Sequence, residues 1–134
     1  MKRIYRNRLK KLADHLNNGE LFHKKFDFST WNVNPRNELT SNKCGYAGCA
    51  IGECPGVFPR FWKFSLMGNP VLKNNLHNNT MYNIELFFGL ELSAAQHLFV
   101  PGYQLPSAFG GKVLGDRATR KAVAKNIYKF LERF

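Results

Sequence analysis

The chain has 134 residues and a formal net charge of +11, and 44% of its residues are hydrophobic and 14% aromatic. Such a composition is too apolar for a disordered chain, and the length suits a single domain with one core across residues 1–134. No apolar run reaches the roughly 18 residues that would span a bilayer, and the basic start lacks the apolar stretch of a secretory signal. An odd number of cysteines, three, argues against a secreted disulfide framework. These features predict a cytoplasmic protein with no membrane span.

The positive charge is concentrated in two terminal segments. Residues 1–11 contain six bases and no acid, and residues 112–134 contain seven bases and two acids. The hundred residues between them are neutral, with seven bases and seven acids. This segregation indicates a negatively charged partner, such as nucleic acid, an acidic protein face or an anionic membrane surface.

The first basic segment begins an amphipathic helix, which we expect over about residues 4–16. Tyr5, Leu9, Leu12 and Leu16 recur at helical spacing and form one apolar stripe. Asn17, Asn18 and Gly19 then supply a helix end.

Residues 42–52 are rich in cysteine and glycine. If they form a helix, Gly45, Gly48, Cys49 and Gly52 fall on one face. Three glycines would each cost a helix about 1 kcal/mol relative to alanine, so the pattern calls for close approach of another element. On this interpretation Cys49 is a small buried side chain.

An alternative gives the same segment a chemical role. Cys44 would lie near the N-terminus of the helix, where the helix dipole favours a thiolate, and it would act as a nucleophile assisted by His97. The spacing of Cys44, Cys49 and Cys54 turns successive thiols about 140° apart on a helix, which is unsuited to a metal site. We therefore expect no metal and no cofactor, and we keep a thiol-dependent enzyme as an alternative.

The rest of the middle region, within residues 17–111, consists of short elements joined by turns. Phe26 and Phe28, and likewise Trp62, Phe64 and Leu66, alternate with polar residues in short strand-like runs, which allow one small hairpin. Thr80 is expected to cap a helix over about residues 81–88 that ends at Gly89. Ser93 and Gln96 match the capping box of a second helix, which would end at Pro101. This second helix carries no Arg or Lys, so two core helices are favoured over a DNA-reading helix-turn-helix.

The second basic segment is a helix expected over about residues 117–134. Its apolar face is formed by Val123, Ile127, Phe130, Leu131 and Phe134. Bases repeat every fourth residue on the opposite side, and Tyr128 projects among them, as an aromatic ring for stacking between phosphate contacts would. Together these elements predict a mainly α fold, that is, a small α or α+β single domain. Amphipathic terminal helices would surround an aromatic-rich core of short elements, which could include one small hairpin.

Several short motifs resemble a group of small uncharacterised proteins of bacterial and phage genomes. They are Cys44-Gly45 with Cys49-Ala50-Ile51-Gly52, Phe88-Gly89-Leu90, Ala95 with Leu98-Phe99, and a helix begun by Thr with Val123, Ile127 and Leu131. The centre of the group reads Cys-Gly-Thr-x-x-Cys-x-x-Gly, whereas Tyr46 replaces the Thr here and Glu91-Leu92 lengthens the Gly-Leu turn. The resemblance implies a bacterial or phage accessory protein of the host cytoplasm and assigns no functional residue.

The sequence thus favours a non-enzymatic protein that binds nucleic acid, or the acidic surface of a host or virion protein, through its terminal helices. A structural component of the virion is a further alternative. The expected binding residues are Lys2, Arg3, Arg6, Arg8, Lys10, Lys11, Arg117, Lys121, Lys125, Tyr128, Lys129 and Arg133.

Overall fold

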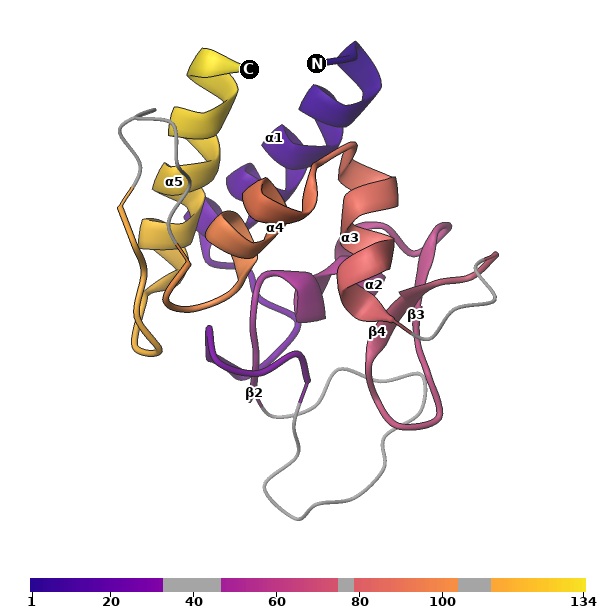
Figure 1. The fold of residues 1–134 in the computed structure, drawn as a ribbon. Coiled ribbons are helices and arrows are strands. Elements are labelled where there is room, and N and C mark those ends of the chain that lie inside the picture. Colours follow the sequence, from indigo (N-terminus) through magenta and orange to yellow (C-terminus); the bar gives the residue numbers. More distant parts are fainter. Residues whose placement is uncertain (33–46, 75–78, 104–111) are drawn as a thin grey trace.

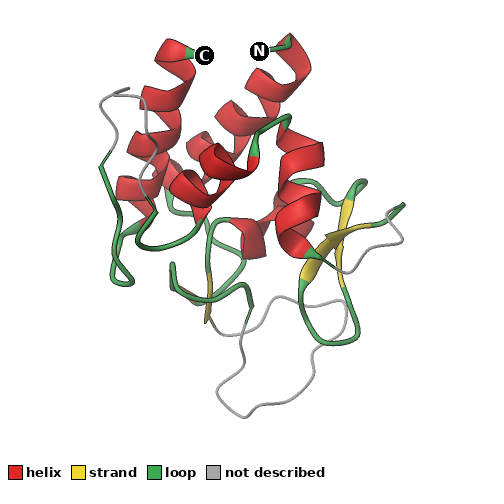
Figure 2. Ribbon diagram, viewed as in Figure 1, coloured by secondary structure: helices red, strands yellow, loops and turns green. Residues whose placement is uncertain are grey.

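The computed structural model describes residues 1–32, 47–74, 79–103 and 112–134 (Figure 1). Its helices are α1 (Arg3–Asn18), α2 (Cys54–Val57), α3 (Thr80–Phe88), α4 (Leu92–Phe99) and α5 (Arg120–Arg133), with a 3₁₀ turn at Ile51–Glu53. Figure 2 shows the helices grouped together and the strands at the margin. The predicted mainly helical fold is confirmed.

Two small sheets complete the fold. β1 (Lys25–Phe26) pairs in parallel with β2 (Ala47–Gly48), and β3 (Trp62–Phe64) pairs antiparallel with β4 (Pro70–Leu72). The second pair is a small hairpin that includes Trp62 and Phe64 of one expected strand-like run, whereas Phe26 of the other run lies in the parallel pair. Its turn contains Gly68 at φ 82°, in the left-handed region that glycine adopts without strain.

The two terminal helices lie side by side and run in opposite directions, so the chain ends are neighbours (Figure 1). α1 ends as predicted at Gly19, which has φ 80° and donates its N–H to the carbonyl of His15. α5 begins at Arg120, three residues later than expected, because the Thr119 hydroxyl caps it by accepting from the N–H of Ala122. Both predicted apolar stripes are largely buried, but Tyr5 of α1 is half-buried and Phe134 after α5 is 45% exposed.

The helices α3 and α4 exist as predicted, but both predicted caps are wrong. Asn79 caps α3 by accepting from the N–H of Tyr82, whereas the hydroxyl of Thr80 donates to Pro70 and ties α3 to β4. Ser93 lies inside the first turn of α4, whose N-cap is Glu91 without a side-chain bond. α4 ends at Phe99, before Pro101, and it buries most of its side chains, as a core helix does.

The predicted helix over the Cys-Gly segment is also wrong within the described residues. Ala47 and Gly48 form β2, and Gly52 lies in the 3₁₀ turn. The glycines still serve close approach, but to the segment that includes His23 and Trp31. A Cβ at Gly48 would lie 2.5 Å from Nε2 of His23, and one at Gly52 would lie 1.8 Å from the carbonyl oxygen of Trp31. Cys49 is buried, as expected.

Replacing Gly52 therefore tests the fold. Gly52→Ala should destabilise the protein by about 2–4 kcal/mol, because the methyl group collides with backbone that cannot rotate away. Gly115→Ala is the matched control, since a Cβ there meets nothing within 4 Å. It should change the free energy of unfolding by less than about 1 kcal/mol in urea denaturation. Equal losses in the two variants would contradict this packing.

Candidate functional site

The antiparallel packing of α1 and α5 brings the two basic segments to one part of the surface. We define the basic face as the bases of these helices and of the residue before α1, without Arg8 and Arg120, whose guanidinium groups bond within the fold: Lys2, Arg3, Arg6, Lys10, Lys11, Lys121, Lys125, Lys129 and Arg133. α1 and α5 contain just two acidic residues, Asp14 and Glu132. The face therefore carries a large excess of positive charge.

Asp14 and Tyr128 mark the seam between the helices. The hydroxyl of Tyr128 donates to the carboxylate of Asp14, and Nζ of Lys10 lies 3.6 Å from the same carboxylate. Lys121 and Lys125 precede Tyr128 by seven and three residues, so they border the seam on the α5 side. Lys129 and Arg133 lie about 100° or more round the helix from Tyr128 and extend the face away from α1.

Tyr128 thus differs from its predicted environment. Burial raises the pKa of its hydroxyl to about 12, and the bond to Asp14 acts in the same direction. The hydroxyl stays protonated at neutral pH and serves as the donor that joins the helices. The ring is half-buried against the core, so its part in the site is to hold the seam.

Two arginines of these segments are engaged within the fold. Nη1 of Arg8 donates to the backbone carbonyl of Phe87 at 2.8 Å. The guanidinium group of Arg8 also lies 4.1 Å from the centroid of the Phe87 ring. Arg120 donates from Nη1 to the carbonyls of Leu16 and Asn17 at 2.7 and 3.0 Å, and so closes the C-terminus of α1. Arg8, a predicted binding residue, is therefore primarily a packing residue.

Arg117 lies before α5 and apart from the seam. It borders an open pocket of about 450 Å³ together with Lys25, Asp27 and Asp116. The two carboxylates offset the two bases, so this pocket has no net charge to attract an anion.

Of the two residues of the thiol alternative, only His97 is among the described residues. Cys44 lies outside them. His97 is 1% exposed, and its Nδ1 is 2.9 Å from the carbonyl oxygen of Tyr103. Burial lowers the pKa of His97, against the effect of this bond.

The described cysteines are unsuited to nucleophilic chemistry. Burial raises the pKa of Cys49 to about 12 and that of Cys54 well above its usual value, so both thiols stay protonated. Within the described ranges, no three His, Cys, Asp or Glu side chains are placed to share a metal ion.

A buried network that sequence reasoning missed joins Glu53 to two histidines. The Glu53 side chain has no exposed surface, and Nε2 of His15 lies 2.8 Å from its Oε1. Nδ1 of His23 bonds to Oε2, and the backbone N–H groups of Phe22 and His23 donate to the same carboxylate. Burial alone would raise the pKa of Glu53, but the bonds from His15, His23 and the two amides outweigh it and lower the pKa to about 2.

The network continues to the hairpin. Nε2 of His23 lies 2.7 Å from Oδ1 of Asn32, whose Nδ2 donates to the carbonyl of Gly68 at 3.0 Å. Nδ1 of His23 thus faces Glu53 and Nε2 faces Asn32, so both ring nitrogens are engaged. A ring engaged at both nitrogens is not free to shuttle protons, so the network is a structural anchor and not a catalytic pair.

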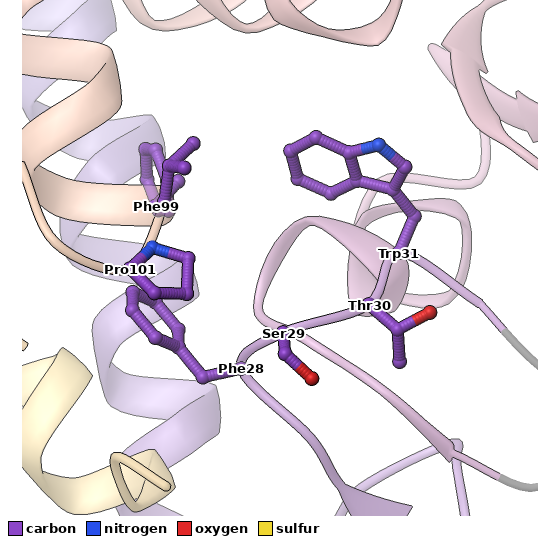
Figure 3. A pocket seen from close by; sticks show the side chains of 7 residues that line it. Phe28, Ser29, Thr30, Trp31, Phe99 and Pro101 are labelled. Carbon is purple, nitrogen blue, oxygen red and sulfur yellow. The ribbon is translucent and has the colours of Figure 1, made fainter. Parts of the chain in front are cut away.

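One further pocket, of about 250 Å³, opens between the segment 28–31 and the end of α4 (Figure 3). The indole of Trp31 faces Phe99 and Pro101 across the gap, and the side chains of Ser29 and Thr30 point away from it. The carbonyl of Thr30 accepts a hydrogen bond from the N–H of Cys49. With no charged side chain in its wall, the pocket offers neither acid–base groups nor an anion site.

The Glu53 network gives a pH test. Because the pKa of Glu53 is depressed from 4.5 to about 2, its contribution is complete above about pH 4.5 and is lost as the pH falls towards 2. The free energy of unfolding should fall by about 3 kcal/mol across this window beyond the loss seen in Glu53→Gln. Urea unfolding of both proteins at pH 7, 4 and 2.5 checks this. Parallel curves would show that Glu53 is not held as an ionised carboxylate.

A second pair of variants separates structural from surface bases. Arg120→Met should destabilise the fold by about 1–3 kcal/mol, because two carbonyls at the end of α1 lose their charged donor. Lys121→Met removes the same charge from an exposed neighbour and should change stability by less than about 0.5 kcal/mol. Thermal or urea unfolding measures both. A loss in Lys121→Met as large as that in Arg120→Met would refute the assignment.

We compared the chain with protein-family models, curated proteins and solved structures, and none of them matches it. None of the described helices is both long enough and apolar enough to cross a membrane. The residues themselves are therefore the basis for assigning a function.

Proposed function

We propose that the protein binds a polyanion, and specifically nucleic acid, through the basic face of α1 and α5. The observation that carries the proposal is the antiparallel packing of the two helices, which places two separate basic segments next to each other. Neighbouring helix axes lie about 8–10 Å apart, close to the Debye length of about 8 Å at physiological ionic strength. Bases on both helices can therefore act on one negatively charged strand.

The cost of this arrangement also supports a charged partner. Lys121, Lys125, Lys129 and Arg133 follow one another at intervals of four residues in α5. Each such like-charged pair destabilises a helix by a few tenths of a kcal/mol. Phosphates of a bound polyanion would relieve the repulsion, so ligand and fold should stabilise each other.

The chemistry of the face favours phosphate contacts over base reading. Most of its exposed charge is lysine, a point charge that binds phosphate without the paired donors that recognise a guanine edge. On α5, no exposed Asn or Gln is available to read adenine, because Asn126 is buried and bonds to the backbone of Lys112, whereas α1 carries the exposed Asn7, Asn17 and Asn18. The predominance of lysine favours binding that depends more on backbone charge than on sequence. A nucleic acid partner is consistent with action in the bacterial cytoplasm and with a phage or bacterial accessory role.

Charge reversal tests the proposal. Wild-type protein should bind labelled DNA or RNA with an affinity that falls steeply with salt, at a log–log slope near −4 for about five phosphates. Lys121→Glu with Lys125→Glu should weaken binding at least about tenfold. Lys24→Glu with Lys63→Glu makes the same change in net charge on exposed residues outside α1 and α5 and should have a much smaller effect.

Fluorescence anisotropy over a salt series measures these affinities. Absence of binding at about 50 mM salt would rule out nucleic acid and leave an acidic protein surface as the partner. Equal losses in the two double variants would show that net charge, and not the α1–α5 face, determines binding.

A further inference from the structure

A small pocket lies where the basic face meets the start of the hairpin. Its volume is about 220 Å³, and it is lined by Lys11, Phe58, Pro59, Arg60 and Phe61. Drug-sized ligands occupy pockets of roughly 300 Å³ or more, so this one suits a single ring system. Its lining combines two aromatic rings with two cations and no acid.

The ring of Phe61 is partly exposed at the pocket. The side chain is 47% exposed although Phe87 packs against it with ring centroids 5.6 Å apart. The guanidinium of Arg8 lies 5.3 Å from the centroid of Phe61 and 4.1 Å from that of Phe87, so it is shared by the two rings. An apolar ring kept half exposed beside a cation is a suitable platform for a flat, electron-rich ligand.

The cations of the pocket are exposed. Arg60 and Lys11 both reach solvent, and Nζ of Lys11 lies 5.3 Å from the centroid of Phe58. The backbone around the pocket is held in place: Phe61 donates to the carbonyl of Phe58, and Lys73 donates to the carbonyl of Phe61. The platform is thus formed before any ligand arrives, which reduces the entropic cost of binding.

Lys11 belongs both to the basic face and to the wall of the pocket. Tyr128 of α5 bonds to Asp14, Lys10 pairs with Asp14, and the next residue along α1 is Lys11 of the pocket wall. The pocket therefore borders the basic face at Lys11, which lies about 100° round α1 from Lys10.

We infer that this pocket accepts an unpaired base, stacked on Phe61, and that the nucleic acid bound by the protein is single-stranded. The inference rests on the function proposed above. Bases of a single strand are free to leave the strand and stack on an aromatic ring, whereas paired bases in a duplex are not. Lys11 and Arg60 contact the phosphates that flank the stacked base.

The test compares two strands with equal charge. A fluorescein-labelled oligothymidine of about 12 nucleotides and an abasic strand of the same length differ only in their bases. Wild-type protein should bind the oligothymidine about fivefold or more tightly than the abasic strand. It should also bind oligothymidine more tightly than the matching duplex at the same salt concentration.

Variants assign the difference to Phe61. Phe61→Leu keeps an apolar side chain against Arg8 and Phe87, and it should bring oligothymidine binding down to the abasic level with an unchanged salt slope. Phe61→Tyr should retain the preference. Tyr82→Ala removes a comparably exposed ring, 42% exposed, from α3 outside the pocket lining and should have no effect.

Three results would overturn the inference. Equal binding of the oligothymidine and abasic strands by the wild type would remove base stacking while leaving the proposed polyanion function intact. A full preference in Phe61→Leu would show that the base is recognised elsewhere. If neither strand binds at about 50 mM salt, the inference and the proposed function fail together.

Discussion

The packing of α1 against α5 is the constraint on which the rest of the structure and its proposed function depend. Buried leucines of α1 and aliphatic residues of α5 hold the helices together, and Arg120 and Tyr128 fix their relative position through bonds to α1. These contacts bring bases from the two ends of the sequence into one region of space. The core thus sustains an arrangement that charge repulsion alone would oppose.

A second constraint holds the neutral part of the molecule. Glu53 is buried with four donors around its carboxylate, and the connection through His23 and Asn32 reaches the hairpin turn at Gly68. A buried carboxylate without such partners would be strongly destabilising, so the four donors make its burial possible. Because the same network fixes the segment from Phe22 to Asn32, it also sets the close approach of that segment to Gly48 and Gly52.

Sequence patterns predicted those features that depend on neighbours along the chain. The spacing of Leu9, Leu12 and Leu16 located α1, and Gly19 and Gly89 correctly marked helix ends. The cap of α3 was wrongly predicted as Thr80 in place of its neighbour Asn79, because the bond from the Thr80 hydroxyl to Pro70 depends on tertiary structure. The glycines of the Cys-Gly segment indicated close packing, but the partner was a distant loop and the local conformation was not helical. Glu53 and its histidines lie 30 and 38 residues apart, and no local periodicity connects them. For the candidate site, the sequence predicted two basic helices. It did not predict the contact between them, the structural roles of Arg8 and Tyr128, or the pocket at Phe61, because these depend on tertiary structure.

The central claim is that α1 and α5 act as one binding surface. Amide chemical-shift mapping by NMR during titration with oligothymidine at low salt tests it most directly. We expect signals of Lys10, Asp14, Lys121 and Lys125 to move together and to follow one binding curve, since they border the same seam. Shifts confined to one of the two helices, or gathered around the pocket between Trp31 and Pro101, would contradict a shared surface.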